Sequence, residues 1–156
     1  MSISQRMVLR NRSVRSATWT GMGTRDGRCT NKLIKLTETL ARCQVGLIIT
    51  GFAYVTPNGQ AMPRQLSIHD DAMIPGLKKL TQRVHKAKGK IVMQIVHAGV
   101  QCVVRDIEEK NTWGPSAVHD KVFRRTPKAM TQQDIKETVK AFAAAAGRVK
   151  RAGFDG

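Results

Sequence analysis

Residues 46–55, GLIITGFAYV, and residues 90–99, KIVMQIVHAG, decide the fold class of this chain. Both are short apolar runs rich in isoleucine and valine, and such runs are typical of strands buried on both faces of a parallel sheet. The segment between them has the longer period of an amphipathic helix. This order of strand, helix and strand predicts an α/β fold with parallel strands.

Three helices are predicted from apolar residues that recur at spacings of three and four. The first follows the potential capping residue Thr30, and its apolar stripe consists of Leu33, Leu36, Leu40 and Cys43. The second covers about residues 71–87, and its inward side chains are Ile74, Leu77, Leu80 and Val84. The third follows a capping box of Thr131 and Asp134, and its apolar face consists of Ile135, Val139, Phe142, Ala146 and Val149.

Two further segments complete the expected order of elements. Residues 13–18 are predicted as a first strand, which precedes the first helix. Residues 99–130 show no clear periodicity and are predicted as a long loop, which in compact domains often carries function.

Length and composition narrow the class of protein. The 156 residues, of which 41% are hydrophobic, suffice for the core of one domain over residues 1–156. No apolar run approaches the roughly 20 residues of a membrane-spanning helix, and no signal-peptide pattern follows the first arginines. We therefore expect a cytoplasmic protein without a membrane partner. Cys29, Cys43 and Cys102 are too few and too widely spaced for a metal or redox motif, so we expect free thiols and no metal site.

Charge is the unusual bulk property, because 27 Lys and Arg against 11 Asp and Glu leave a net charge of +16. Charge of this sign favours salt-sensitive, nonspecific attraction to polyanions. The basic residues are spread along the sequence and aromatic residues make up only 4% of it, so specific nucleic-acid binding is not predicted.

Several segments resemble, in order, the old yellow enzyme family of NADH:flavin oxidoreductases and ene-reductases. They are NRSVRSATW (11–19), VGLIITGFAYVTPNGQAMPRQLSIHDD (45–71), GKIVMQIVHAG (89–99), GPSAV (114–118) and AGFDG (152–156). The resemblance implies a (β/α)₈ TIM barrel that holds FMN at the carboxyl ends of its strands. A complete barrel takes roughly 250 residues, so the chain is expected to be the N-terminal half only, with about three βα units.

The resemblance also implies which residues contact the cofactor. Ser16, Ala17 and Thr18 match the end of the first strand, whose backbone meets the flavin ring. Phe52 occupies a position where the family usually has a small residue, so its ring could stack on the flavin or obstruct it. Gln94 matches the glutamine whose amide binds the pyrimidine edge, and a polar residue within an apolar strand independently favours a functional role.

Two tryptophans are candidates for the substrate side of the site. Trp19 replaces the Thr or Cys of many relatives, and the alternative is a packing role at the rim of the barrel. Trp113 lies in the long loop and could contribute to a lid. His97 is interpreted as a histidine hydrogen-bonded to the backbone near the rim rather than as a substrate ligand.

The expected function is therefore hydride transfer from NAD(P)H through FMN to an activated alkene or other small-molecule acceptor. No catalytic residue is assigned, because the family's His/His or His/Asn pair and its phosphate-binding loops have no counterpart in these residues. On its own the chain is expected to bind FMN weakly, and a complementing C-terminal half or self-association could complete the sheet. The alternatives are a noncatalytic half-barrel and a basic protein that binds polyanions. Neither the acceptor nor the choice of NADH or NADPH follows from the sequence.

Overall fold

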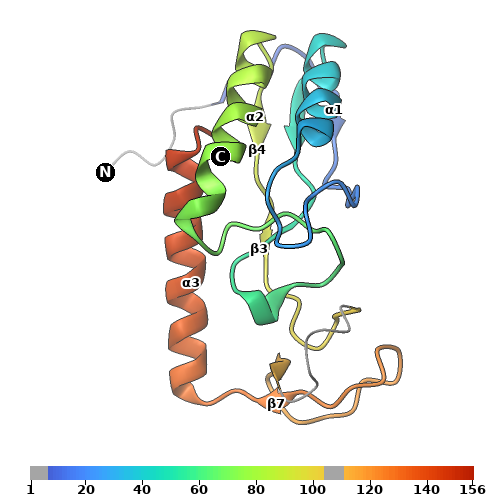
Figure 1. Ribbon diagram of the computed structural model, residues 1–156, viewed down its shortest axis with the longest axis vertical. Coiled ribbons are helices and arrows are strands. Elements are labelled where there is room, and N and C mark those ends of the chain that lie inside the picture. The colour runs from blue at the N-terminus through green and yellow to red at the C-terminus, as the bar shows by residue number, and fades with distance from the viewer. Residues whose placement is uncertain (1–6, 104–110) are drawn as a thin grey trace.

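The computed structural model describes residues 7–103 and 111–156, which form short strands and three long helices (Figure 1). The helices are α1 (Asn31–Arg42), α2 (Ile74–Lys86) and α3 (Gln132–Arg151), with two short 3-10 helices, η1 (Pro57–Gly59) and η2 (Asp71–Met73). The strands are β1 (Val14–Arg15), β2 (Leu47–Ile49), β3 (Ala53–Tyr54), β4 (Ile91–Val92), β5 (Ile95–Val96), β6 (Trp113–Gly114) and β7 (Lys128–Ala129).

The central sheet is parallel, as the sequence predicts, with strand order β1-β2-β4. Ile48 in β2 pairs with Ile91 in β4, and Ile49 pairs with Val92. A second parallel ladder, β3-β5, continues the same two chain segments toward their carboxyl ends. Helices α1 and α2 lie side by side next to this sheet (Figure 1). The arrangement confirms the predicted α/β class.

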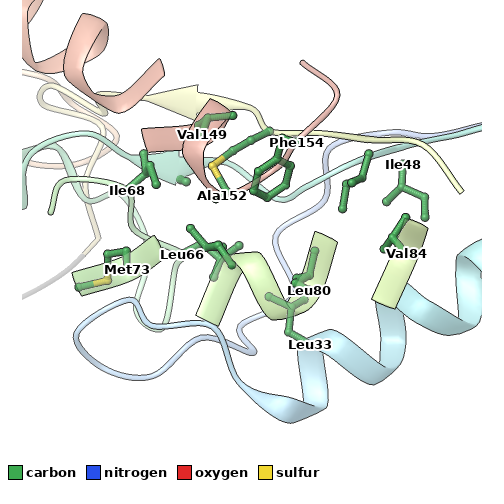
Figure 2. Packing of buried hydrophobic residues seen from close by; sticks show 14 of the residues in the cluster. Leu33, Ile48, Leu66, Ile68, Met73, Leu80, Val84, Val149, Ala152 and Phe154 are labelled. Atoms are coloured by element: carbon green, nitrogen blue, oxygen red, sulfur yellow. The ribbon is translucent and has the colours of Figure 1, made fainter. Parts of the chain in front are cut away.

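The hydrophobic core fills the space between the helices and one face of the sheet. Leu33 of α1, Leu80 and Val84 of α2, and Ile48 of β2 are buried together, and Val149 and Phe154 approach from the end of the chain (Figure 2). The inward residues predicted for α2 are therefore confirmed. Burial of a side chain of this size contributes about 1.5–3 kcal/mol, so this cluster is a main source of stability.

The two faces of the central sheet differ in burial. Alternate residues Ile91, Met93 and Ile95 pack with the core, so Val92 and Gln94 lie on the opposite face. On that second face Val92 is only half-buried, and Val14 of β1 is 50% exposed. The sheet thus presents an apolar second face, which we call the inner face and which also includes Leu47 and Ile49.

The helix starts are formed as predicted. The Thr30 side chain accepts a hydrogen bond from the Leu33 N–H at the start of α1. At the start of α3, Thr131 and Asp134 form a reciprocal capping box, which satisfies N–H groups that lack partners inside the helix.

Three expectations about strands and loops need correction. Residues 13–18 form a strand only at Val14–Arg15, because regular pairing with β2 ends at Arg15. The expected strand 46–55 is interrupted between Ile49 and Ala53 by an irregularity in the pairing. The predicted loop 99–130, of which residues 104–110 lie outside the described ranges, is not wholly irregular, because β6 and β7 form a parallel pair within it.

Two predicted apolar faces are also partly wrong. Cys43 is exposed, because α1 ends at Arg42 and Cys43 is already the capping residue where the chain turns. Ile135 and Val139 are 49% and 63% exposed. Both belong to the first half of α3. In the second half the predicted Ala146 is also exposed, whereas Ala145 and Val149 are buried. None of the helices within the described ranges has the length and apolar character needed to cross a membrane.

Candidate functional site

The carboxyl ends of β1, β2 and β4 meet at one edge of the sheet. Gly51, just beyond β2, lies against the segment that follows β1, since a Cβ atom at this position would lie 2.7 Å from the carbonyl oxygen of Thr18. On the other side, the Ala53 N–H donates a 2.8 Å hydrogen bond to the carbonyl oxygen of Gln94. The backbone thus brings together three segments that the sequence predicts to contact a cofactor.

A β-bulge shapes this edge. Ile49 pairs with Val92, whereas Ala53 pairs with Ile95, so four steps along one chain segment oppose three along the other. The extra residue lies in the segment 50–52, which contains Phe52. Bulges redirect side chains and are common next to active sites. The hydropathy pattern of residues 46–55 contains no signal for this irregularity.

The segment after β1 offers main-chain groups to a ligand. Ser16 is exposed and Ala17 and Thr18 are half-buried. The Thr18 hydroxyl donates a hydrogen bond to the Ser16 carbonyl oxygen at 3.1 Å. Among the residues that the structure describes, no backbone hydrogen bond uses the N–H groups of Ala17 and Thr18. These two donors are therefore available to a bound molecule.

Gln94 offers the complementary side-chain groups. It lies on the inner face of the sheet, its side chain is exposed, and it makes no side-chain hydrogen bond to any described residue. A primary amide has two donors and an acceptor, so one Gln94 side chain can bind both kinds of group on the edge of a heterocycle. The sequence singled out Gln94, and the structure leaves its amide unengaged.

Trp19 and Phe52 line the helix side of the same strand ends. Trp19 is 39% exposed and its ring packs over Gly21, where a Cβ atom would lie 3.3 Å from the indole. Phe52 is half-buried. Both border a cavity of about 40 Å³ that lies between α1 and the sheet and is too small for an aromatic ligand. The cavity therefore lies behind the strand ends and is not itself the cofactor site.

Thr50 is a candidate that the sequence analysis missed. Its side chain is buried at the end of β2, it borders the same cavity, and its hydroxyl has no hydrogen-bond partner in the part of the chain that the structure describes. Buried hydroxyls are almost always satisfied, so an unpaired one next to a ligand-binding edge is notable. A threonine that ends the apolar run LII was the available signal.

Trp113 lies in a different cluster from the strand-end residues. Its ring stacks on His97, with ring centroids 5.9 Å apart and an angle of 15° between the planes. His97 also contacts η1, because a Cβ atom at Gly59 would lie 2.7 Å from Cδ2 of His97. His97 therefore holds β6 and η1 together beyond the end of β5.

The hydrogen bonds of His97 define its protonation state. Its Nδ1 accepts a 3.1 Å hydrogen bond from the Gly99 N–H, so the proton of the neutral ring is on Nε2. Burial lowers the pKa of His97 below its usual value, which favours this neutral form. The predicted contact to the backbone is confirmed. Among the described residues, Nε2 is buried without a hydrogen-bond partner, and so is the hydroxyl of Thr56 near Gly59.

The chemistry of the strand ends fits a flat heteroaromatic ring. Two main-chain donors, one free amide and the apolar inner face are the groups that such a ring needs at its edges and its plane. Within the described ranges no group of three or more His, Cys, Asp and Glu side chains could hold a metal ion.

Comparison with known proteins agrees with this arrangement. The model of the NADH:flavin oxidoreductase / NADH oxidase family matches residues 1–156. A Bacillus subtilis protein named as a probable NADH-dependent flavin oxidoreductase is 42% identical over 113 residues, which cover 72% of this chain and 30% of that protein. An NADPH dehydrogenase of Halalkalibacterium halodurans is 39% identical over 132 residues, 84% of this chain and 37% of that protein. The chain spans about a third of the length of these relatives.

Solved structures show the same likeness. Old Yellow Enzyme from a Pichia species superimposes with a TM-score of 0.87 at 26% identity, over 94% of this chain and 41% of that one. Morphinone reductase in complex with tetrahydroNAD gives a TM-score of 0.80 at 25% identity, over 94% of this chain and 44% of that one.

Proposed function

The chain belongs to the NADH:flavin oxidoreductase / NADH oxidase family, and on this basis we propose that it forms the N-terminal part of an FMN-binding (β/α)₈ barrel. The whole activity would be hydride transfer from NAD(P)H through FMN to an activated alkene or another small acceptor. The contribution of this chain is the part of the site that holds the flavin ring. The observation that carries the proposal is that the ends of β1, β2 and β4 meet, and that Gln94, just beyond β4, makes no side-chain hydrogen bond to any described residue.

The inner face supports a barrel as the setting. In a closed barrel, one face of each strand carries helices and the other fills the interior. Here α1 and α2 cover the face of Ile48 and Ile91, while Val92 on the other face is half-buried. The next strand position is already occupied, because Asp155 N–H donates to the Ile91 carbonyl oxygen and the Gly156 carbonyl oxygen accepts from Met93. These two hydrogen bonds support the proposal that about three βα units lead into a fourth strand.

Each residue of the site has a distinct task. The N–H groups of Ala17 and Thr18 would donate to acceptors on the ring, and the Gln94 amide would bind its pyrimidine edge. Phe52, re-aimed by the bulge, would limit the space beside the ring. Bound FMN supplies the hydride chemistry, and the protein supplies position and hydrogen bonds. Trp19 and Trp113 remain candidates for the substrate side.

The proposal includes a binding partner that covers the inner face of the sheet. Exposed apolar area such as that at Val14 favours association, and either a complementing half of the barrel or a second copy of the chain would bury it.

The test is to titrate the chain with riboflavin and with FMN while following flavin fluorescence. Because the proposed contacts are to the ring and none is to the phosphate, the two flavins should bind with dissociation constants equal within about twofold. Gln94→Leu should weaken both by about tenfold, because the amide loses two or more hydrogen bonds to the ring. Gln133→Leu, an exposed glutamine on α3, is the matched control.

Three outcomes would contradict the proposal. Much tighter binding of FMN than of riboflavin would mean that the chain holds the phosphate and not the ring. Flavin binding that is unchanged in Gln94→Leu, or no binding of either flavin, would favour the noncatalytic half-barrel instead.

A further inference from the structure

The outer faces of α1 and α2 form a surface of one charge. Together the two helices carry seven Lys and Arg residues and one acidic residue, Glu38. Arg42 at 2.8 Å and Arg83 at 3.8 Å neutralise Glu38. Within the described part of the chain, the remaining cations form no salt bridge, and they are Lys32, Lys35, Lys78, Lys79 and Lys86. Charges that are spread along the sequence are therefore gathered by the fold.

A groove runs between the two helices on this surface. It has a volume of about 360 Å³ and is lined by Asn31, Ile34, Lys79, Gln82, Arg83 and Lys86. Lys79, Arg83 and Lys86 are spaced by four and three residues, so they follow one another along one side of α2 over about 10 Å. Figure 1 shows α1 and α2 next to each other.

The lining of the groove points to a particular kind of partner. None of the six lining residues is aromatic, so the groove has no platform on which nucleic-acid bases could stack. Ile34 is half-buried and apolar, and Asn31 and Gln82 carry amides that can bind peptide groups. A second copy of the same basic face would be repelled, since the chain carries a net charge of +16.

We propose that the groove between α1 and α2 is a docking site for an acidic peptide segment of a partner protein. Carboxylates of the segment would lie against Lys79 and Lys86, and an apolar side chain would contact Ile34. Long-range attraction by the surrounding lysines would speed association and make it sensitive to salt. This surface lies on the helix side of the sheet, away from the inner face, so docking would not compete with a cofactor.

The test uses a fluorescein-labelled peptide of alternating Glu and Leu residues and follows its fluorescence anisotropy with the 156-residue chain. The variant Lys79→Gln/Lys86→Gln should bind about tenfold more weakly, while Lys136→Gln/Lys140→Gln should change affinity by less than about twofold. The control pair removes the same charge from exposed positions on α3. Arg83 is left in place because it neutralises Glu38.

A second experiment distinguishes binding of an acidic peptide from binding of a nucleic acid. Ile34→Thr should weaken the Glu/Leu peptide but leave a single-stranded oligothymidine of equal charge unaffected. Equal weakening by both lysine pairs would show attraction by net charge alone and overturn the proposal. Tighter binding of the oligonucleotide than of the peptide, lost in Lys79→Gln/Lys86→Gln, would overturn it in favour of a nucleic-acid surface.

Discussion

Gly51 is the residue at which two strand ends come closest. Replacing it with alanine should lower the free energy of unfolding by about 1–3 kcal/mol, because the new Cβ atom would lie 2.7 Å from the Thr18 carbonyl oxygen and the backbone must move. Urea unfolding measures the change. Gly147→Ala in α3 is the control, since nothing lies within 4 Å of its Cβ position and alanine should add about 0.5–1 kcal/mol. A Gly51→Ala chain as stable as the parent would refute the close approach.

His97 gives the chain a pH-dependent contribution to stability. Because burial lowers the pKa of His97 from 6.5, the unfolded state takes up a proton at a higher pH than the folded state does. The free energy of unfolding should therefore fall as the pH is lowered through 6.5 toward the folded-state pKa. Urea unfolding at about pH 7.5 and about pH 5.5 should show a smaller loss for His97→Gln than for the parent. Identical losses would show that His97 is solvated in the folded state.

The functional residues differ in how well their roles could be predicted from the sequence. Gln94 could be identified because a polar residue inside an apolar strand is costly unless it has a use. Trp113 could be named but not placed, since its stack on His97 joins residues from distant segments. The free hydroxyl of Thr50 depends on what surrounds it in three dimensions, and threonine is ordinary in strands.

At the scale of elements, α3 consists of two halves that differ in burial. Val149 is 7% exposed, whereas Val139 is 63% exposed. We expect Val149→Ala to lower the free energy of unfolding by about 1–3 kcal/mol and Val139→Ala by less than about 0.5 kcal/mol. Denaturant unfolding of the two variants, which remove the same atoms from one helix, gives the comparison. Equal losses would show that an additional contact covers Val139 in solution.

Elements could be predicted where their signal is local in the sequence. Thr30, Thr131 and Asp134 act within one turn, so helix starts follow from local sequence alone. The apolar period of α3 continues from Ile135 to Val149, but a period says only that a face is apolar and not that a neighbour covers all of it. The bulge between Ile49 and Ala53 arises from pairing with another strand, which no single segment encodes.

For the whole molecule, the inner face should act as an exposed apolar surface in solution. We expect the native chain to enhance the fluorescence of the dye ANS, and Val14→Thr to reduce this signal, because Val14 is half exposed at the edge of that face. Val122→Thr, an exposed valine outside the sheet, should leave the signal unchanged. Loss of the signal at higher protein concentration would indicate that copies of the chain cover the face themselves. A parent chain that binds no dye when dilute would contradict the open inner face.

The extra residue between Ile49 and Ala53 limits how this part of the chain can be recombined with the matching parts of other family members. Every side chain downstream of a bulge has its direction set by that one residue, because strands alternate with a period of two. A chimaera in which all of these residues paired regularly, without the bulge, would turn Ala53, now fully buried, toward the opposite face and bring its neighbours out of register. Crossovers before Leu47 or after Val55 would keep each side chain of this segment on its present face of the sheet. These are therefore the places at which parts can be exchanged.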